Sequence, residues 1–177
     1  MIRKRNEMDA IPEFTRDILV SIHPNYASKI LTGEKTVELR RRFPEAGTRG
    51  ALALIYSTSP VKAIVGLARI KHVLKLPVSR IWKEHGPAAC VSRSEFYNYF
   101  SGVRHGFAIL FVDVHLLKER ITAPTLFAKF GIVPPQSYRY VTDECVALLS
   151  DERFQAPDRH ERRHRTRRRP TRSGVSR

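Results

Sequence analysis

Residues 18–43, ILVSIHPNYASKILTGEKTVELRRRF, contain three successive patterns of side chains. The run DILVSI, residues 17–22, is rich in β-branched residues and predicts a short strand. Residues 23–33 predict a helix, because Pro24 suits the first helical position and Gly33 suits the C-terminal cap. In residues 35–43 the side chains alternate, which predicts a second strand with one polar face, formed by Thr36, Glu38, Arg40 and Arg42.

Within this stretch, residues 33–40 follow the pattern G-x-K-x-x-E-x-R. Glu38 and Arg40 are two positions apart on the predicted strand, so their side chains point to the same face. Lys35 lies at the start of that strand, where its amine can reach over the same face. Two cations and one carboxylate are therefore expected on one patch. The alternative is that Glu38 and Arg40 pair only with each other, or with neighbouring arginines, on a solvated strand face.

The chain between this motif and residue 150 alternates short apolar runs with helix signals. Further strands are predicted at 50–57, 63–76 and 105–117, and helices at 78–86, from Ser92 onward, and before Gly131. Gly66 indicates a bulge or a close approach within its strand. Ser92 and Glu95 fit a capping box. A Pro-Pro pair at 134–135 interrupts regular structure, and a last short strand or helix follows it.

Five or six strands with helices inserted between them predict an α+β domain around a small closed or nearly closed sheet. The predicted order is strand, helix, three strands, two helices, strand. It lacks the regular alternation of strand and helix that is typical of a parallel sheet.

The GEKTVELR motif resembles the signature of the ASCH family, which belongs to the PUA-like superfamily. Further blocks are also similar to this family: ALIYSTSPVKAIVGLARI, VSRSEFYNYFSG and FGIVPPQSYRYV. The resemblance is to a prokaryotic branch often described as predicted transcriptional regulators. It implies a PUA-like small β-barrel of five to six strands with inserted helices. It also divides the chain into an N-terminal extension (1–16), an ASCH domain (17–150) and a disordered Arg-rich tail (151–177).

The same resemblance implies a cleft with Lys35, Glu38 and Arg40 on its floor, and a role in binding RNA or a nucleotide-like ligand. A modified base is an expected target, with a function in transcriptional or translational regulation. The residue types suit this role. Arg40 can grip a phosphate or a base carbonyl with paired donors, Lys35 supplies a point charge, and Glu38 can accept a hydrogen bond from an exocyclic amine.

Two other segments offer candidate ligand-binding groups. Tyr56, Ser57 and Ser59 follow an apolar strand at a Pro-stiffened turn, where hydroxyls and a stacking ring can face a ligand. Their alternative is an ordinary serine-rich turn with Tyr56 in the core. Gln136 and Ser137 belong to a segment with a mixture of amide, hydroxyl, aromatic and guanidinium groups that suits nucleic-acid contact. The alternative there is a rigid loop that packs across the end of the barrel.

An enzyme is the second hypothesis, because the resemblance includes small ASCH proteins that hydrolyse acylated cytidines and others described as nucleases. An amidohydrolase acting on acylated nucleosides such as N4-acetylcytidine would use Lys35 as its nucleophilic or activating amine and Glu38 as general acid and base. Thr36 or Ser57 would supply a hydroxyl, and Glu84 or Glu95 is a further candidate carboxylate. The resemblance speaks against this reading at one point, since the small amidohydrolases typically have Thr at the position of Glu38. The sequence leaves three readings open: a binding module, an enzyme, and a protein-interaction adaptor that uses the fold as a scaffold.

Composition sets limits on the class of protein. The chain has 177 residues, a formal net charge of +15, 42% apolar residues and two cysteines, which excludes collagen, coiled coils and full disorder. No apolar stretch is long enough for a bilayer span and no secretory signal is recognisable, so a cytoplasmic protein with free thiols and no membrane partner is expected. No spacing typical of metal ligands and no nucleotide-binding loop is found, so neither a metal nor a cofactor is predicted.

The segment after residue 150 carries ten arginines and a net charge of +6. It has almost no apolar residues to bury, and this predicts disorder. Arg-rich tails attract phosphate backbones through counterion release, so RNA and possible DNA partners are expected for this segment. The alternative is a tail that only improves solubility.

Overall fold

The computed structural model describes residues 15–150. Most of the predicted extension 1–16 and all of the predicted tail 151–177 lie outside the described residues. The described elements, in chain order, are β1 (Ile18–Ile22), α1 (Pro24–Leu31), β2 (Val37–Arg40), β3 (Leu52–Ser57), β4 (Ala63–Pro77), α2 (Val78–His85), a 3₁₀ turn (Pro87–Ala89), α3 (Arg93–Tyr99), β5 (His105–Thr122), α4 (Ala123–Phe130), β6 (Tyr138–Tyr140) and α5 (Asp143–Ser150).

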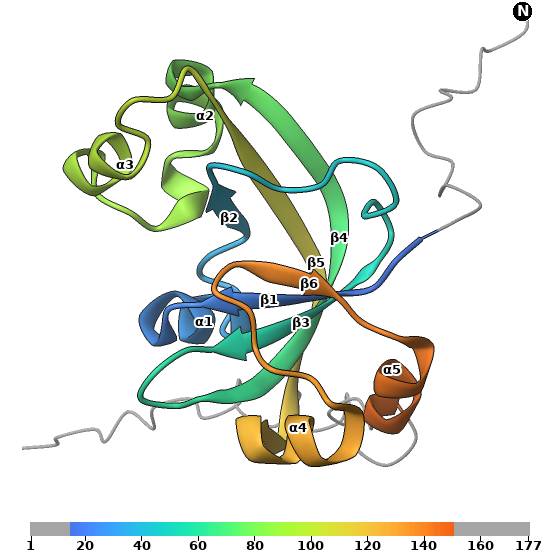
Figure 1. The fold of residues 1–177 in the computed structure, drawn as a ribbon. Coiled ribbons are helices and arrows are strands. Elements are labelled where there is room, and N and C mark those ends of the chain that lie inside the picture. Colours follow the sequence, from blue (N-terminus) through green and yellow to red (C-terminus); the bar gives the residue numbers. More distant parts are fainter. Residues whose placement is uncertain (1–14, 151–177) are drawn as a thin grey trace, which may run out of the picture.

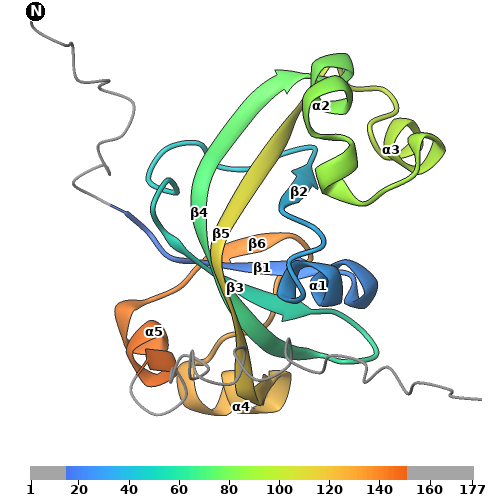
Figure 2. The same ribbon diagram turned by 180° about the vertical axis from the view of Figure 1, so that it is seen from behind.

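All six strands form one curled sheet in the order β2-β5-β4-β3-β1-β6. The predicted α+β class with a nearly closed sheet is confirmed. β1 and β3 pair in parallel, and the other neighbours are antiparallel. The long antiparallel pair of β4 and β5 forms the spine of the molecule in Figure 1, with α2 and α3 at one end and α4 and α5 at the other. The reverse view in Figure 2 shows the same arrangement, with α1 beside β1 and β3.

The sheet buries apolar side chains on both faces. Ile18, Val20 and Ile22 of β1 belong to a core that also includes α1, whereas Leu19, between them, belongs to a second core under α4 and α5. A strand covered on both faces explains why β1 is apolar at successive positions. A third core lies between the β2 end of the sheet and α2 and α3, where Trp82 stacks against Phe96 at 5.0 Å between ring centroids.

Gly66 is both a bulge and a point of close approach, as its position in the strand predicted. The register between β4 and β5 shifts between Ile64 and Gly66. A Cβ at Gly66 would lie 2.6 Å from the backbone oxygen of His115 and would also collide with the side chain of Leu31. Since neither α1 nor β5 has room for a methyl group here, only glycine fits this position.

Helix boundaries follow the capping residues. Ser92 accepts from the backbone of Glu95, and the Glu95 carboxylate accepts from the Ser92 backbone, so the predicted capping box is confirmed. α4 ends at Gly131, which has φ 63°, as predicted. Residues 136–150, predicted as one short strand or helix, contain both β6 and α5.

Two strand lengths differ from prediction. β5 continues to Thr122, because β4 pairs with it along its whole length. The strand predicted over 35–43 is only four residues long and ends at Arg40. Among the described strands, β2 pairs with β5 alone, and Arg40 lies opposite Phe107. Since β5 begins at His105, residues beyond Arg42 have no strand residue opposite them.

Candidate functional site

Arg40 joins the two edges of the curled sheet. β2 is one edge strand, and β6, which pairs with β1, is the other. The Arg40 guanidinium donates from Nη2 to the backbone oxygen of Ser21 at 2.6 Å and from Nη1 to the hydroxyl of Ser137 at 3.3 Å. A side chain, not a ladder of backbone hydrogen bonds, thus bridges this part of the barrel. The gap that it spans leaves room for a cleft.

Glu38 lies between two cations. Its Oε1 is 3.0 Å from Nη2 of Arg40, and its Oε2 is 3.5 Å from Nζ of Lys35. All three residues are buried. The structure therefore contradicts the alternative of a solvated strand face, because the side chains of Lys35, Glu38 and Arg40 meet inside the molecule.

Lys35 is the most deeply buried charged residue of the three, with 2% of its surface exposed. Its Nζ donates to the backbone oxygen of Ala89 at 2.6 Å, at the end of the 3₁₀ turn, where carbonyl groups favour a cation. The Tyr26 ring lies 5.1 Å from the same Nζ. Burial lowers the pKa of Lys35, although the neighbouring Glu38 carboxylate acts in the opposite direction.

A cleft of about 240 Å³ opens above this cluster. Its walls come from β1, α1, β2 and α3, and the lining residues are Ser21, Ile22, His23, Tyr26, Lys35, Glu38, Leu39, Arg40, Val91, Glu95, Phe96 and Tyr99. Tyr26 and Tyr99 supply aromatic rings, and the hydroxyl of Tyr99 donates to the Leu39 backbone oxygen at 3.4 Å. The cleft is therefore apolar and aromatic on its walls and ionic on its floor.

The cleft has balanced charges. Lys35 and Arg40 contribute two positive charges, and Glu38 and Glu95 contribute two negative ones. Hydrogen bonds from Ser92 lower the pKa of Glu95 and keep its carboxylate ionised. Burial, followed by the charges of Glu95 and Glu38, raises the pKa of Tyr26, so its phenol stays neutral. A neutral ligand with both donors and acceptors fits these surroundings better than a bare anion does.

A second hollow, of about 460 Å³, shares Arg40 and Tyr99 with the cleft. Its other lining residues are Arg41, Arg42, Val103, Ser137 and Tyr138. Arg41 is held in place by a hydrogen bond from its Nη2 to the backbone oxygen of Ser101 at 3.0 Å. Among the described residues, three arginines and no carboxylate line this hollow. Glu38 already pairs with Arg40, so Arg41 and Arg42 make the hollow positive.

The sequence profile of the ASCH domain family matches residues 20–120. This chain belongs to the ASCH family. It is 30% identical over 147 residues to an ASCH domain-containing ribonuclease of Zymomonas mobilis, and the match covers 81% of this chain and 98% of that protein. The crystal structure of ASCH from Zymomonas mobilis superimposes with a TM-score of 0.73 at 30% identity, covering 79% of this chain and 97% of that one. Structures of its serine-to-alanine and tyrosine-to-phenylalanine mutants match with the same TM-score.

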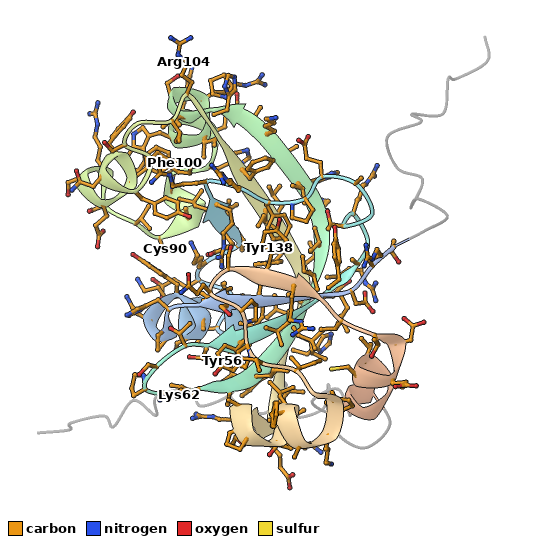
Figure 3. The ribbon with its side chains drawn as sticks, viewed as in Figure 1. Tyr56, Lys62, Cys90, Phe100, Arg104 and Tyr138 are labelled. Atoms are coloured by element: carbon orange, nitrogen blue, oxygen red, sulfur yellow. The ribbon has the colours of Figure 1, made fainter. Side chains whose placement is uncertain are left out.

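None of the other five predicted ligand-binding residues of this ASCH chain lines the cleft. Ser137 lines the second hollow and contacts Arg40. Tyr56 and Ser57 are buried in β3, and Tyr56, labelled near β3 in Figure 3, packs in the core under α4. Ser59 and Gln136 are exposed. None of these last four residues lines either of the two cavities.

Sequence reasoning missed several groups that line the cavities. Tyr26 lies within the helix predicted over 23–33 and Tyr99 within the helix predicted from Ser92 onward, and neither pattern predicts a ligand-binding role for them. Both rings face the ASCH signature residues because α1 and α3, which are far apart in the chain, flank β2. Of the two further carboxylates considered, Glu95 lines the cleft, whereas Glu84 pairs with Arg80 at 2.6 Å on the surface of α2. The capping box fixes where α3 begins, and it is the one signal in the sequence that points to the helix carrying Glu95 and Tyr99.

Within residues 15–150, no group of three or more His, Cys, Asp or Glu side chains is placed to hold a metal ion. No helix of this part of the chain is both long enough and apolar enough to cross a bilayer.

Proposed function

We propose that this ASCH protein binds single-stranded RNA in the cleft and cleaves it. The observation that carries the proposal is the buried cluster of Lys35, Glu38 and Arg40, which opens into a cleft with tyrosine walls. The ribonuclease of Zymomonas mobilis, which this chain matches over 98% of that protein's length, supports the assignment of RNA as the substrate.

Single-stranded RNA suits the cleft better than a duplex, because only an unstacked base can enter a pocket of this size. The Tyr26 and Tyr99 rings offer surfaces for stacking. At the floor, Glu38 accepts hydrogen bonds from an exocyclic amine, and Arg40 and Lys35 donate to ring or carbonyl acceptors. The proposal includes recognition of a modified base, since the apolar wall formed by Val91 and Phe96 can pack against an added methyl or acyl group.

Cleavage of the RNA backbone builds negative charge on a phosphate, and Arg40 is the guanidinium best placed to stabilise it. Ser137 is proposed to take part through Arg40, and Tyr56 from its place in the core of β3, outside both cavities. The tyrosine and the serine substituted in the two Zymomonas mobilis mutant structures are separated by the same number of residues as Tyr56 and Ser137. Ser137 contacts Arg40 directly, so a change at Ser137 alters the position of the guanidinium.

The test uses a fluorescein-labelled single-stranded RNA of mixed sequence and a DNA strand of the same sequence. Arg40→Gln is expected to weaken RNA binding at least tenfold, which corresponds to about 1.4 kcal/mol. Ser137→Ala and Tyr56→Phe are expected to slow cleavage, followed by gel electrophoresis. Lys118→Gln with Arg120→Gln, two exposed positions of β5, is the control that removes charge elsewhere. If Arg40→Gln binds RNA as tightly as the control variant does, the cleft is not the RNA-binding site.

A second candidate function is hydrolysis of acylated nucleosides. The observation in its favour is Lys35, whose pKa is lowered by burial, since a neutral amine is a better nucleophile. Incubation of the protein with N4-acetylcytidine, followed by chromatography, tests it. Release of cytidine by the wild type but not by Lys35→Met would favour the hydrolase, whereas no release by either would exclude this substrate.

Regulation of transcription or translation is proposed as the biological consequence of RNA binding. A protein that occupies or cuts a transcript changes how long the transcript lasts or how well it is translated. Sequencing of RNA crosslinked to the wild type and to Arg40→Gln in cells tests this, since transcripts lost from the variant are the expected targets.

A further inference from the structure

The cleft and the second hollow differ in charge although they share a wall. The cleft has two cations and two carboxylates among its lining residues, whereas the hollow has Arg40, Arg41 and Arg42 and no carboxylate. The Tyr99 ring and the Arg40 guanidinium lie between them, since both residues line both cavities. A ligand that fits both the cleft and the second hollow therefore has an uncharged part next to an anionic part.

We propose that the second hollow is a phosphate subsite, which binds the backbone phosphate adjoining the base that enters the cleft. This proposal rests on the proposed RNA-binding function and adds to it. Its ligand is a nucleotide and not a nucleoside, because the base and the phosphate are held on opposite sides of Tyr99. Arg41 and Arg42, which lie outside the family signature, are given the role of binding this phosphate.

The buried arginine supplies the first argument. Nε of Arg40 is buried and has no hydrogen-bond partner among the described residues, although its Nη1 and Nη2 both have one. A buried donor without a partner costs free energy, so Arg40 gains if its guanidinium turns and Nε meets an acceptor in the hollow, which Arg40 lines. A phosphate oxygen is the acceptor that best matches a guanidinium edge.

The hydroxyl group of Ser137 supplies the second argument. Its Oγ accepts a hydrogen bond from Arg40, which leaves its own hydrogen directed elsewhere and able to donate to an anion. The phenol of Tyr138, in the same hollow, is a further donor. Hydroxyl donors beside guanidinium groups are typical contacts of backbone phosphates.

The two exposed arginines supply the third argument. Arg41 and Arg42 follow directly after β2, and neither forms an ion pair with a carboxylate within residues 15–150. Arg41 is already oriented by its bond to the Ser101 backbone, which reduces the entropy lost when it binds an anion. Like charges placed side by side without a counter-charge repel each other, and a bound phosphate relieves that repulsion.

The main experiment measures RNA binding by fluorescence anisotropy at several KCl concentrations. The variant is Arg41→Gln with Arg42→Gln, and the control is Lys118→Gln with Arg120→Gln, which removes the same charge from β5. We expect at least tenfold weaker binding for the variant only. The slope of log affinity against log salt should fall by about 0.7 for each phosphate contact that is lost.

A chemical variant of the RNA locates the effect. With a neutral methylphosphonate in place of one phosphate, scanned along the strand, one position should remove the difference between the wild type and the arginine variant. If the arginine variant behaves as the control does in affinity and in salt slope, the phosphate subsite is wrong while RNA binding stands.

A separate measurement needs no RNA strand, so it judges the subsite even if the proposed function fails. Cytidine, cytidine 3′-monophosphate and inorganic phosphate are titrated into ¹⁵N-labelled protein, and the arginine Nε–Hε signals are followed by NMR. We expect the Arg40 signal to shift with the nucleotide and with phosphate, and the shift to be lost in the arginine variant. No shift with either anion, or an equal shift in the variant, overturns the phosphate subsite.

Discussion

Lys35 has surroundings that are unusual for a lysine, because its ammonium is removed from water almost completely. A backbone oxygen, a carboxylate and an aromatic face replace the water around it. These partners compensate the desolvation only in part, and the pKa of Lys35 is lowered as a result. A group of this kind is typical of functional sites, where a charge is held in place at a cost to stability.

The lowered pKa of Lys35 makes stability depend on pH. Between this pKa and the ordinary value of 10.5, the unfolded chain binds the proton and the folded chain does not, so the free energy of unfolding rises with pH in that window and is constant below it. Lys35→Met removes this contribution. We expect the difference in unfolding free energy, wild type minus variant, to increase toward alkaline pH in urea titrations.

Lys29→Met is the control for this pH dependence, because the hydrogen bond with Glu34 raises the pKa of Lys29 instead. The stabilising contribution of Lys29 is present below pH 10.5 and is lost at higher pH. The difference in unfolding free energy, wild type minus Lys29→Met, is therefore not expected to increase as the pH approaches 10.5 from below. A pH-independent difference for Lys35→Met would show that the ammonium keeps its proton throughout.

Glu38 is predicted to be necessary for stability as well as for binding. Glu38→Gln leaves two cations buried beside each other without the carboxylate between them. Removing one partner of a buried ionic group is expected to cost about 3 kcal/mol of unfolding free energy, measured by urea denaturation. Glu84→Gln, at an exposed pair on α2, should show no measurable change. A similar result for both variants would mean that Lys35 and Arg40 find other partners.

At the scale of elements, α3 acts as one wall of the cleft. It is only seven residues long, and Glu95, Phe96 and Tyr99 all face the site from it. A helix of this length is not stable by itself, so its cap and its packing against Trp82 hold it in place. The capping box therefore positions this wall of the cleft, with Ser92 outside the cleft and Glu95 in its lining.

Ser92→Ala is expected to lower the free energy of unfolding by about 1 kcal/mol, because the first turn of α3 loses the acceptor for its backbone amides. Hydrogen exchange at the Glu95 amide should accelerate more than exchange in β4. Asn98→Ala, at an exposed position of the same helix, is the matched control and should leave that amide protected. Equal acceleration along the whole chain would indicate global unfolding instead of local opening.

The sheet is closed by side chains at this same place. Among the described strands, backbone pairing links β2 to β5 alone. The gap toward β1 and β6 is crossed by Arg40 and by the tilted rings of Phe43 and Tyr138, 5.1 Å apart between centroids. An opening with polar groups on both sides is thus a consequence of the topology. The family signature lies on the edge strand because the opening is there.

At the scale of the whole molecule, positive charge is spread over both the described domain and the segment after it. Of the net charge of +15, the last 27 residues contribute +6. We predict that a chain ending at Ser150 keeps the binding that depends on Arg40 but has a lower affinity and a shallower salt dependence. Anisotropy titrations of the shortened chain, with and without Arg40→Gln, measure this. Loss of all RNA binding on shortening would place binding in the tail.

The sequence alone was sufficient for features that depend on neighbours along the chain. The α1 and α3 boundaries follow from Pro24, Gly33 and the Ser92 capping box, and the bulge at Gly66 follows from a glycine within an apolar strand. The alternation on β2 put Glu38 and Arg40 on one face. These features are local, because backbone conformation and the hydrogen bonds of helix ends depend on residues a few positions apart.

Only the tertiary structure decided which distant groups complete the site. Ala89 accepts from Lys35 across 54 positions of sequence and Ser137 from Arg40 across 97, and no local pattern signals such pairs. The curl of the sheet brings its edges together, and the same curl buries the motif and leaves Ser59 and Gln136 outside. The physical reason is that burial depends on how elements pack in space, whereas the sequence pattern records only which face each side chain takes on its own element.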